Sequence, residues 1–240
     1  MAVFQTVGYM TRFSSVSVFL CMMSIHSRNP YILNGGDQVM QCMGFFLIFA
    51  PAGAVLSVDR WRRIRQDKER ADQIPLCPPW AQRMIQIQAS VLYFATFYFK
   101  TQGPWWINGT AVHYASRLLE FQHFPMPVIQ NLFVLRALTW STLLIEFSLG
   151  VLVWFRDLRY PVLLAGLCLH MGIEYAMVIP LFEWASVSTY VTFIYPEDLA
   201  RAGAWFRNRI GPRFAELWIS SLKWKSGGTQ ESAAPAKIKT

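Results

Sequence analysis

Residues 84–110 read MIQIQASVLYFATFYF and then KTQGPWWINGT, so an apolar run ends in Lys100, followed by Trp105 and Trp106. Such a run is typical of a membrane span or a buried helix, and tryptophan collects where a span meets water. The ammonium of lysine is strongly hydrated, and partial burial would favour the neutral amine, a usable base. The stretch therefore predicts either a catalytic base at position 100 or an interface anchor whose long side chain reaches water.

The composition of the whole chain is that of a membrane protein. Its 240 residues are 54% hydrophobic and 15% charged, with a positive mean hydropathy, which is too apolar for an ordinary soluble domain of this length. The net charge is +8, but the basic residues form two blocks that match no nucleic-acid module, so we expect no nucleic acid as a partner. The cysteines and histidines lack metal-ligand spacing, so we also expect no metal.

The apolar pattern predicts an all-α bundle of about six membrane-spanning helices. Pro51 and Gly53 fall inside the second segment, where membrane helices tolerate them. Pro180 either separates the last two segments or kinks one long element. The expected spans are Val7–Ile25, Val39–Ser57, Met84–Phe99, Leu132–Phe155, Tyr160–Val178 and Phe182–Tyr195.

The distribution of basic residues predicts the orientation in the membrane. Arginine and lysine concentrate in residues 60–83 and 201–239, whereas the opposite side carries Arg28, Lys100 and Arg117. The positive-inside rule then places both termini in the cytoplasm. We expect a multi-pass protein whose first partner is the lipid bilayer, in the inner or plasma membrane if the chain is bacterial.

Two parts follow from this division of the chain. Residues 1–200 form the expected transmembrane domain, and residues 201–240 form a basic cytoplasmic tail. From about residue 225 the tail is rich in Gly, Ser, Ala and Lys, a composition typical of disorder.

Ionisable residues inside apolar segments are the candidates for chemistry, because such groups are costly within a membrane. Glu146 falls in the fourth segment, while His170 and Glu174 fall in the fifth, four residues apart on one helix face. Together with Lys100 and His26, which border the outward loops, they are placed to line one cavity. The alternative is a helix-packing network in which a histidine or an arginine is paired with a carboxylate and is inert.

Two aspartates are candidates for local structure. Asp37 follows Asn34 and two glycines, and it is placed to cap the second segment. Asp59 ends that segment on the expected cytoplasmic side, where we interpret it as part of an interface anchor.

Several motifs, taken in order, resemble the HTTM family, the horizontally transferred transmembrane domain. They are HSRNPYILNGGD at 26–37, FAPAGAVLSVD at 49–59, Lys100 with WINGTAV at 106–112, residues 146–159 and LHMGI at 169–173. The resemblance covers roughly residues 10–200. The best-known member of that family is the vitamin K-dependent gamma-glutamyl carboxylase.

The resemblance implies a mechanism and the residues that carry it. In the carboxylase, a lysine after a membrane helix deprotonates vitamin K hydroquinone. Oxygenation then gives a strong base that removes a γ-proton from a peptide glutamate before CO2 adds. Lys100 matches that lysine, His26 looks like the active-site histidine after an apolar helix, and His170 resembles the histidine of the later span. A reduced isoprenoid quinone, O2, CO2 and a peptide substrate are therefore the implied reactants.

Two functions remain open on the sequence alone. The first is a quinol-dependent carboxylase with Lys100 and His26 as catalytic residues and with Trp105, Trp106, Glu146, His170 and Glu174 around the pocket. The second is a non-catalytic HTTM protein, such as a lipid or quinone binder, the subunit of a membrane partner or a small transporter. We expect convergence of His26, Lys100 and His170 on one pocket in the first case and their separation in the second.

Overall fold

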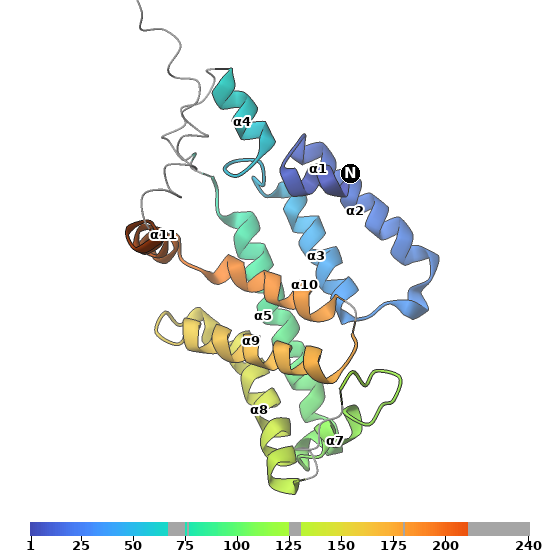
Figure 1. The fold of residues 1–240 in the computed structure, drawn as a ribbon. Helices are drawn as coiled ribbons and strands as arrows, with labels where there is room; N and C mark the ends of the chain where they lie inside the picture. The colour runs from blue at the N-terminus through green and yellow to red at the C-terminus, as the bar shows by residue number, and fades with distance from the viewer. Residues whose placement is uncertain (67–74, 76, 125–130, 180, 211–240) are drawn as a thin grey trace, which may run out of the picture. The chain divides into compact units, whose positions relative to one another are not determined.

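The computed structural model is all-α and describes residues 1–66, 75, 77–124, 131–179 and 181–210 (Figure 1). Those residues contain eleven α-helices and several short 3₁₀ turns. The chain divides into two compact units, Met1–Phe193 and Ile194–Thr240, and each is described by itself.

The first unit begins with four helices around the first two expected spans. A break at Gly8 and Met10, both with positive φ (69° and 46°), divides the first span. Asn34 begins α3: its side chain accepts from Gly36 N at 2.7 Å, and Asp37 accepts from Asn34 N at 2.8 Å. This reciprocal capping box confirms the expected role of Asp37. The helices are α1 (Ala2–Val7), α2 (Thr11–Arg28), α3 (Gly35–Phe49) and α4 (Val58–Arg65).

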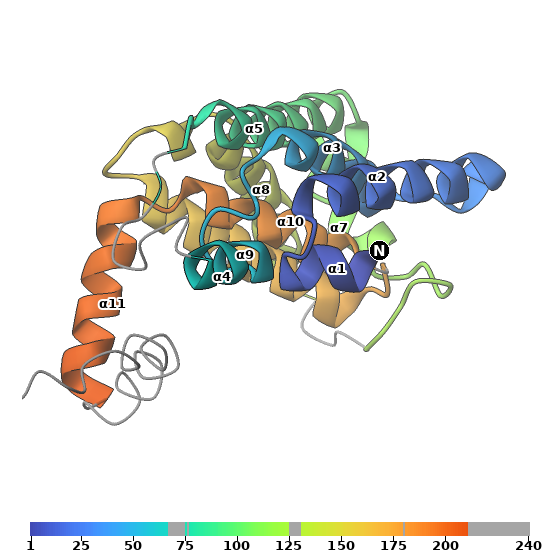
Figure 2. The ribbon, with the colours of Figure 1, turned by 90° about the horizontal axis from the view of Figure 1, so that it is seen from above.

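Six further helices complete the first unit. Helix α5 packs along α8, and α9 lies beside α10, as Figures 1 and 2 both show. The helices are α5 (Trp80–Thr101), α6 (Pro104–Ile107), α7 (Ala111–Ala115), α8 (Leu132–Gly150), α9 (Arg159–Ala176) and α10 (Phe182–Tyr190). Side chains from α5, α8, α9 and α10 meet in one core that includes Tyr93, Leu149, Leu163 and Tyr190.

Every expected span contains a helix, but three of the expected ends are wrong. Helix α3 ends at Phe49 rather than Ser57, because Pro51 lacks an N–H and disfavours helical backbone at Ala50. Helix α8 ends at Gly150 and is followed by a 3₁₀ turn, Leu152–Trp154. Helix α10 has nine residues and ends in the 3₁₀ turn Val191–Phe193.

Among the helices in the described part of the chain, one is long and apolar enough to cross a membrane unaided, namely α8. Helix α3 has 15 residues and is therefore about 22 Å long, against ~30 Å for a hydrocarbon layer. Charged residues lie in the terminal turns of α2, α5 and α9, as Arg12, Lys100 and Glu174 illustrate. Judged by length and apolarity, the described helices thus include one candidate membrane span, whereas six were expected.

Surface and interior are partly inverted relative to a soluble protein. Apolar side chains on the expected spans are exposed: Val91 is 61%, Leu144 64% and Leu164 62% accessible. In contrast, the most deeply buried large side chains are His170 and Glu183. An apolar exterior around a polar interior is what a lipid-facing helical protein requires.

At one end of the unit, Asp59 holds the start of α2. Its carboxylate accepts from the backbone N–H of Met10 (2.9 Å) and Thr11 (2.8 Å) and from the Thr11 hydroxyl (2.9 Å). Burial alone raises the pKa of Asp59, but these hydrogen bonds and the charge of Arg63 outweigh it and lower the pKa below its usual range. Asp59 therefore caps the N-terminus of α2 from a distant part of the sequence, which is a more specific role than the expected interface anchor.

The starts of α5 and α9 lie at the end of α10. Gln82 donates to Thr192 O at 2.6 Å, and Arg159 donates to Phe193 O at 3.4 Å. The start of α10 lies against the start of α3. A Cβ added to Gly36 would lie 2.6 Å from the Phe182 Cα. The contacts thus bring residues 82, 159 and 193 together at one set of helix ends, and residues 36 and 182 together at another.

The second unit contains one described helix, α11 (Pro196–Ile210). Acidic Glu197 and Asp198 lie in its first turn, where they complement the helix dipole, and Asp198 pairs with Arg201 at 3.2 Å. The rest of the expected tail, including the segment expected to be disordered from about 225, lies outside the described residues, as does Pro180.

Candidate functional site

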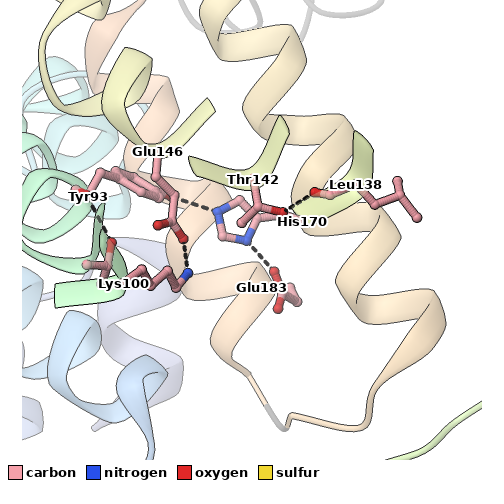
Figure 3. A network of polar contacts seen from close by, with 8 residues as sticks. Tyr93, Lys100, Leu138, Thr142, Glu146, His170 and Glu183 are labelled. Atoms are coloured by element: carbon pink, nitrogen blue, oxygen red, sulfur yellow. Dashed lines mark hydrogen bonds and ion pairs between the residues drawn. The ribbon is translucent and has the colours of Figure 1, made fainter. Parts of the chain in front are cut away.

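Lys100 occupies the last turn of α5 and reaches across to α8. Its Nζ forms an ion pair with Glu146 Oε1, and it lies 4.7 Å from the centre of the Trp106 ring (Figure 3). The side chain is about a quarter exposed, whereas that of Glu146 is buried. An ammonium on an indole face with a buried carboxylate behind it is a strongly stabilised cation.

The turn after Lys100 positions Trp106. Gly109 has φ 74°, in the left-handed region that favours glycine, and an added Cβ would lie 2.8 Å from Arg136 Cγ on α8. The Trp140 indole donates to Ile107 O at 3.3 Å and fastens the turn to the same helix. The WINGT segment therefore docks on α8, and this docking holds the indole over the lysine.

Glu146 has one oxygen without a partner. Oε1 engages Lys100, while Oε2 is buried and has no hydrogen-bond partner among the described residues. A buried acceptor is costly when unsatisfied, so this oxygen is suited to a donor from a ligand or water.

A second cluster lies beside the first, and its centre is His170 on α9. Nδ1 of the ring contacts Glu183 Oε2 on α10, and Nε2 lies 2.7 Å from Tyr93 Oη on α5. Tyr93 Oη lies 3.0 Å from Tyr190 Oη. We call Glu183, His170, Tyr93 and Tyr190 the inner cluster; all four are buried.

A glycine makes the inner cluster possible. A Cβ at Gly166 would lie 2.6 Å from Tyr190 Oη and 3.0 Å from the Leu149 side chain. The absence of a side chain on α9 at this position lets the tyrosine ring reach Tyr93.

The two clusters are electrically coupled. Glu146 interacts through its charge with His170 as well as with Lys100, and Tyr93 lies within range of both carboxylates. Figure 3 shows Glu146 between the lysine amine and the imidazole. The two clusters therefore form neighbouring parts of one buried polar region.

Lys100 and Trp106 also line an apolar cavity of about 470 Å³. Thr142 and Ser141 on α8 and Ser116 are hydroxyl groups on the wall, and each already donates to a backbone carbonyl. The remaining lining is apolar and includes Ile145, Leu169, Ile173, Met177 and Phe182. This volume is in the usual range of small-molecule sites, and the lysine is its cationic group.

His26, the second expected catalytic residue, lies elsewhere. Gln41 contacts its Nδ1, and Asp37 Oδ1 lies 3.4 Å from its Nε2. If the amide donates to Nδ1, the ring proton resides on Nε2 and faces the carboxylate. His26 is not among the residues that line the cavity, so it joins α2 to α3 rather than to Lys100.

Four of the expected pocket residues lie outside the cavity lining, namely Trp105, Glu146, His170 and Glu174. The Trp105 ring packs edge-on against Tyr114 at 4.3 Å and is 52% exposed. Glu174 is four residues from His170, but the carboxylate partner of that histidine is Glu183. The Glu174 backbone oxygen accepts from His123 Nδ1 at 3.3 Å.

Sequence reasoning missed Glu183, Tyr93 and Tyr190. Glu183 carried the same signal as Glu146, a carboxylate inside an apolar segment, and was passed over because it lies at the start of a short one. The tyrosines carried no signal, since a tyrosine in an apolar helix most often belongs to the core. No group of three His, Cys, Asp or Glu residues suited to a metal ion occurs within the described residues.

The structure is that of an all-α protein with ionisable side chains in its interior and an apolar cavity. The chain belongs to the HTTM domain family, a membrane-associated family whose match covers residues 1–197. A protein of Bacillus subtilis (strain 168), described as the uncharacterized protein YitO, is 23% identical over 202 residues. The aligned region covers 80% of this chain and 63% of YitO, so the chain spans less than two thirds of that relative. No solved structure matches the chain significantly.

Proposed function

We propose that this HTTM protein is an integral membrane protein that binds a reduced isoprenoid quinone in the apolar cavity. The Lys100–Glu146 pair then takes up the proton of the quinol, as the first step of a gamma-glutamyl carboxylation. The observation that carries the proposal is a single juxtaposition: the Lys100 amine is held by a buried carboxylate at the wall of a cavity of about 470 Å³.

The cavity suits the chemical character of a quinol. Ile145, Leu169 and Ile173 offer an apolar wall to the ring and to the start of an isoprenoid chain. At the cavity wall Lys100 Nζ is the charged group available to a ring hydroxyl, and Glu146, which does not line the cavity, holds that amine from behind. When bound, the quinol supplies an acidic O–H and the reducing power that activates O2 before CO2 is added.

The pair can accept one proton, and every charge still has a partner after the transfer. As an ammonium and a carboxylate it is neutral overall; with one more proton it becomes an ammonium beside a carboxylic acid. The proton ends on the Glu146 carboxyl, and the Lys100 ammonium stays next to the negative oxygen that the proton left. In this assignment Lys100 stabilises charge and Glu146 holds the proton, so the base is the pair rather than the lysine alone.

The inner cluster supports the pair from behind. His170 is held on both ring nitrogens, by Glu183 and by Tyr93, and its ring lies near Glu146. A ring fixed in this way keeps a polar group in a constant place beside the carboxylate. His170 is thus a positioning residue, acting through Glu146.

The membrane arrangement belongs to the same proposal. Six segments with both termini in the cytoplasm would place residues 59, 82, 159 and 193 on the basic side and the His26 and Lys100 loops outside. The grouping of helix ends supports this alternation, because Asp59 contacts Thr11 while Phe182 contacts Gly36. Reporter fusions test it: a reporter after residue 105 should be outside, and a reporter after residue 66 should be cytoplasmic. Cytoplasmic location of residue 105 would contradict the arrangement.

The chemistry is tested by variants of the pair. The assay measures incorporation of labelled CO2 into a glutamate-containing peptide, with a reduced vitamin K-type quinol and the full chain in detergent. Lys100→Met and Glu146→Gln should each lower the rate about 10²- to 10⁴-fold, the usual contribution of a general base. The matched control is Trp105→Phe, which changes an exposed ring next to the site and should keep the wild-type rate. Full activity of Lys100→Met would refute the assignment.

A second candidate is a non-catalytic quinone or lipid binder on the same scaffold. It is favoured by two observations: His26 and His170 do not line the cavity at Lys100, and Lys100 is already paired with Glu146, as expected for a satisfied structural cation. Quinone bound to the purified wild type, without any incorporation of CO2, would identify this alternative.

A further inference from the structure

A second cavity, of about 510 Å³, lies at the opposite end of α3 from His26. It is lined by the turn that follows α3 (Ala50–Ala54), by Thr11 and Arg12 at the start of α2, and by Arg63 on α4. It shares no lining residue with the cavity at Lys100. The proposed carboxylation makes no use of it, and the inference drawn from it rests only on the membrane arrangement of the proposed function.

The two arginines give one side of this cavity a positive charge. Arg63 lines the cavity and donates to Gly53 O at 3.0 Å, which fixes the guanidinium at the wall. Arg12 lines the cavity too, and its charge has no ion pair among the described residues. Asp59, whose carboxylate feels the charge of Arg63, accepts hydrogen bonds from the N-terminus of α2. Two guanidinium groups around one recess are a recognition site for an oxyanion such as phosphate.

The other side of the same cavity is apolar. Ile48, Phe49 and Trp80 line it, and the rings of Phe49 and Trp80 pack at 5.5 Å while each remains about half exposed. A free inorganic anion has no use for such a wall. An amphiphile that carries a phosphate next to an acyl chain would fill both halves.

Helix α4, which contributes Arg63 to the cavity, has the features of a membrane interface. Helix α4 carries Arg62 over the Tyr9 ring at 5.5 Å and Arg65 over the Trp61 ring at 5.1 Å. The aromatic rings and cations of such a helix are suited to the headgroup layer of an anionic leaflet. This is also the end of the first unit where the basic block of the sequence begins.

We propose that this cavity is a binding site for an anionic phospholipid. Arg12 and Arg63 bind the phosphate diester, and Phe49 and Trp80 cover the first part of an acyl chain. The site would tie α2, α3 and α4 to the leaflet on the basic side of the protein.

The test uses brominated phosphatidylglycerol, whose acyl chains quench nearby tryptophan, and the purified full chain in neutral detergent micelles. In such micelles there is no anionic surface to attract every basic residue alike. We expect saturable quenching that Trp80→Phe reduces, with Arg12→Gln weakening the affinity at least fivefold and Arg12→Gln/Arg63→Gln at least tenfold. Arg65→Gln is the matched control: it removes the same charge from α4 outside the cavity and should change the affinity less than twofold.

Three results would overturn the proposal. Brominated phosphatidylcholine that quenches with the same affinity would remove the requirement for a net negative charge. Equal losses in Arg65→Gln and Arg12→Gln would show general attraction by the basic surface. Displacement of the lipid by millimolar sodium phosphate, with phosphate alone raising the thermal stability of the wild type but not of Arg12→Gln, would show a free-phosphate site. Since Arg63 also holds Gly53, Arg63→Lys and the thermal unfolding of each variant separate lost binding from lost folding.

Discussion

The two histidines expected at the site, His170 and His26, lie in very different surroundings. His170 is 2% exposed and bonded on both ring nitrogens, to Glu183 and Tyr93, from two other helices. His26 lies at the end of α2, and its partners Asp37 and Gln41 come from the next helix in the chain. One histidine is fixed by long-range packing and the other by a local connection between neighbouring helices.

The difference shows what a motif can and cannot establish. The resemblance at residues 26–37 and 169–173 placed both histidines at the site, His26 as a catalytic residue and His170 beside the pocket, because a motif records residue type and order. Neither lines the cavity, and burial and partners distinguish them: His170 is buried near Glu146, whereas His26 contacts Asp37 and Gln41. We therefore expect substitutions around His170 to have large effects on stability and substitutions around His26 to have small ones.

The largest effect is expected from Glu183→Ala. It removes the carboxylate from a fully buried pair and leaves His170 without its acidic partner, a change that typically costs about 3–5 kcal/mol. Thermal unfolding of the purified variant in detergent, compared with the wild type, measures the loss. Asp37→Ala is the matched variant at His26, and equal losses in the two would erase the distinction between the histidines.

A smaller effect is expected from Gly166→Val. Its side chain would overlap Tyr190 Oη and Leu149, so overpacking should cost about 1–3 kcal/mol and separate the tyrosines of the inner cluster. Gly172→Ala, on the same helix with nothing within 4 Å of the added Cβ, should be neutral or slightly stabilising. Denaturation of both variants in parallel checks this, and a stable Gly166→Val would contradict the packing of the cluster.

His26→Ala should destabilise the protein less than Glu183→Ala, because its pair with Asp37, at 3.4 Å, is less buried than the pair of His170 with Glu183. The rate of CO2 incorporation should also remain within a few-fold of the wild type, since His26 lies outside the cavity. A loss of 10²-fold or more, with folding intact, would return His26 to the catalytic site and defeat the contrast with His170.

The smallest effect concerns the other end of α2, where the pKa of Asp59 is lowered. A carboxyl whose pKa is depressed in the folded state contributes stability that is fully present above its unfolded pKa of about 3.9. That contribution is lost as the pH falls through the folded pKa. The unfolding temperature of the wild type should therefore fall more steeply below about pH 4 than that of Asp59→Asn. If the unfolding temperatures of the two proteins fell equally with pH, the charge of Asp59 would contribute nothing to the capping of α2.

Much of the fold followed from apolar pattern, and the misses have local causes. The runs around α5, α8 and α9 located those helices, because long apolar periodicity is a strong signal. The end of α3 was misplaced because Pro51 was read as tolerated, whereas the chain turns there. Lys100, Glu146 and Trp106 were expected around one pocket, but the ion pair of Lys100 with Glu146 was not anticipated. The inner cluster was not anticipated either, since Glu183 and Tyr93 meet His170 through contacts between helices distant in sequence.

The central claim is that the cavity beside Lys100 holds a quinone, and extraction of bound quinone tests it most directly. The wild-type chain, purified in detergent and analysed by mass spectrometry, should carry an isoprenoid quinone. Gly172→Trp should lose it, because Gly172 lines the cavity and has open space beyond its Cα. Gly203→Trp, which adds the same side chain to open space on α11, should retain it. Equal quinone content in the wild type and in Gly172→Trp, or none in the wild type, would contradict the account.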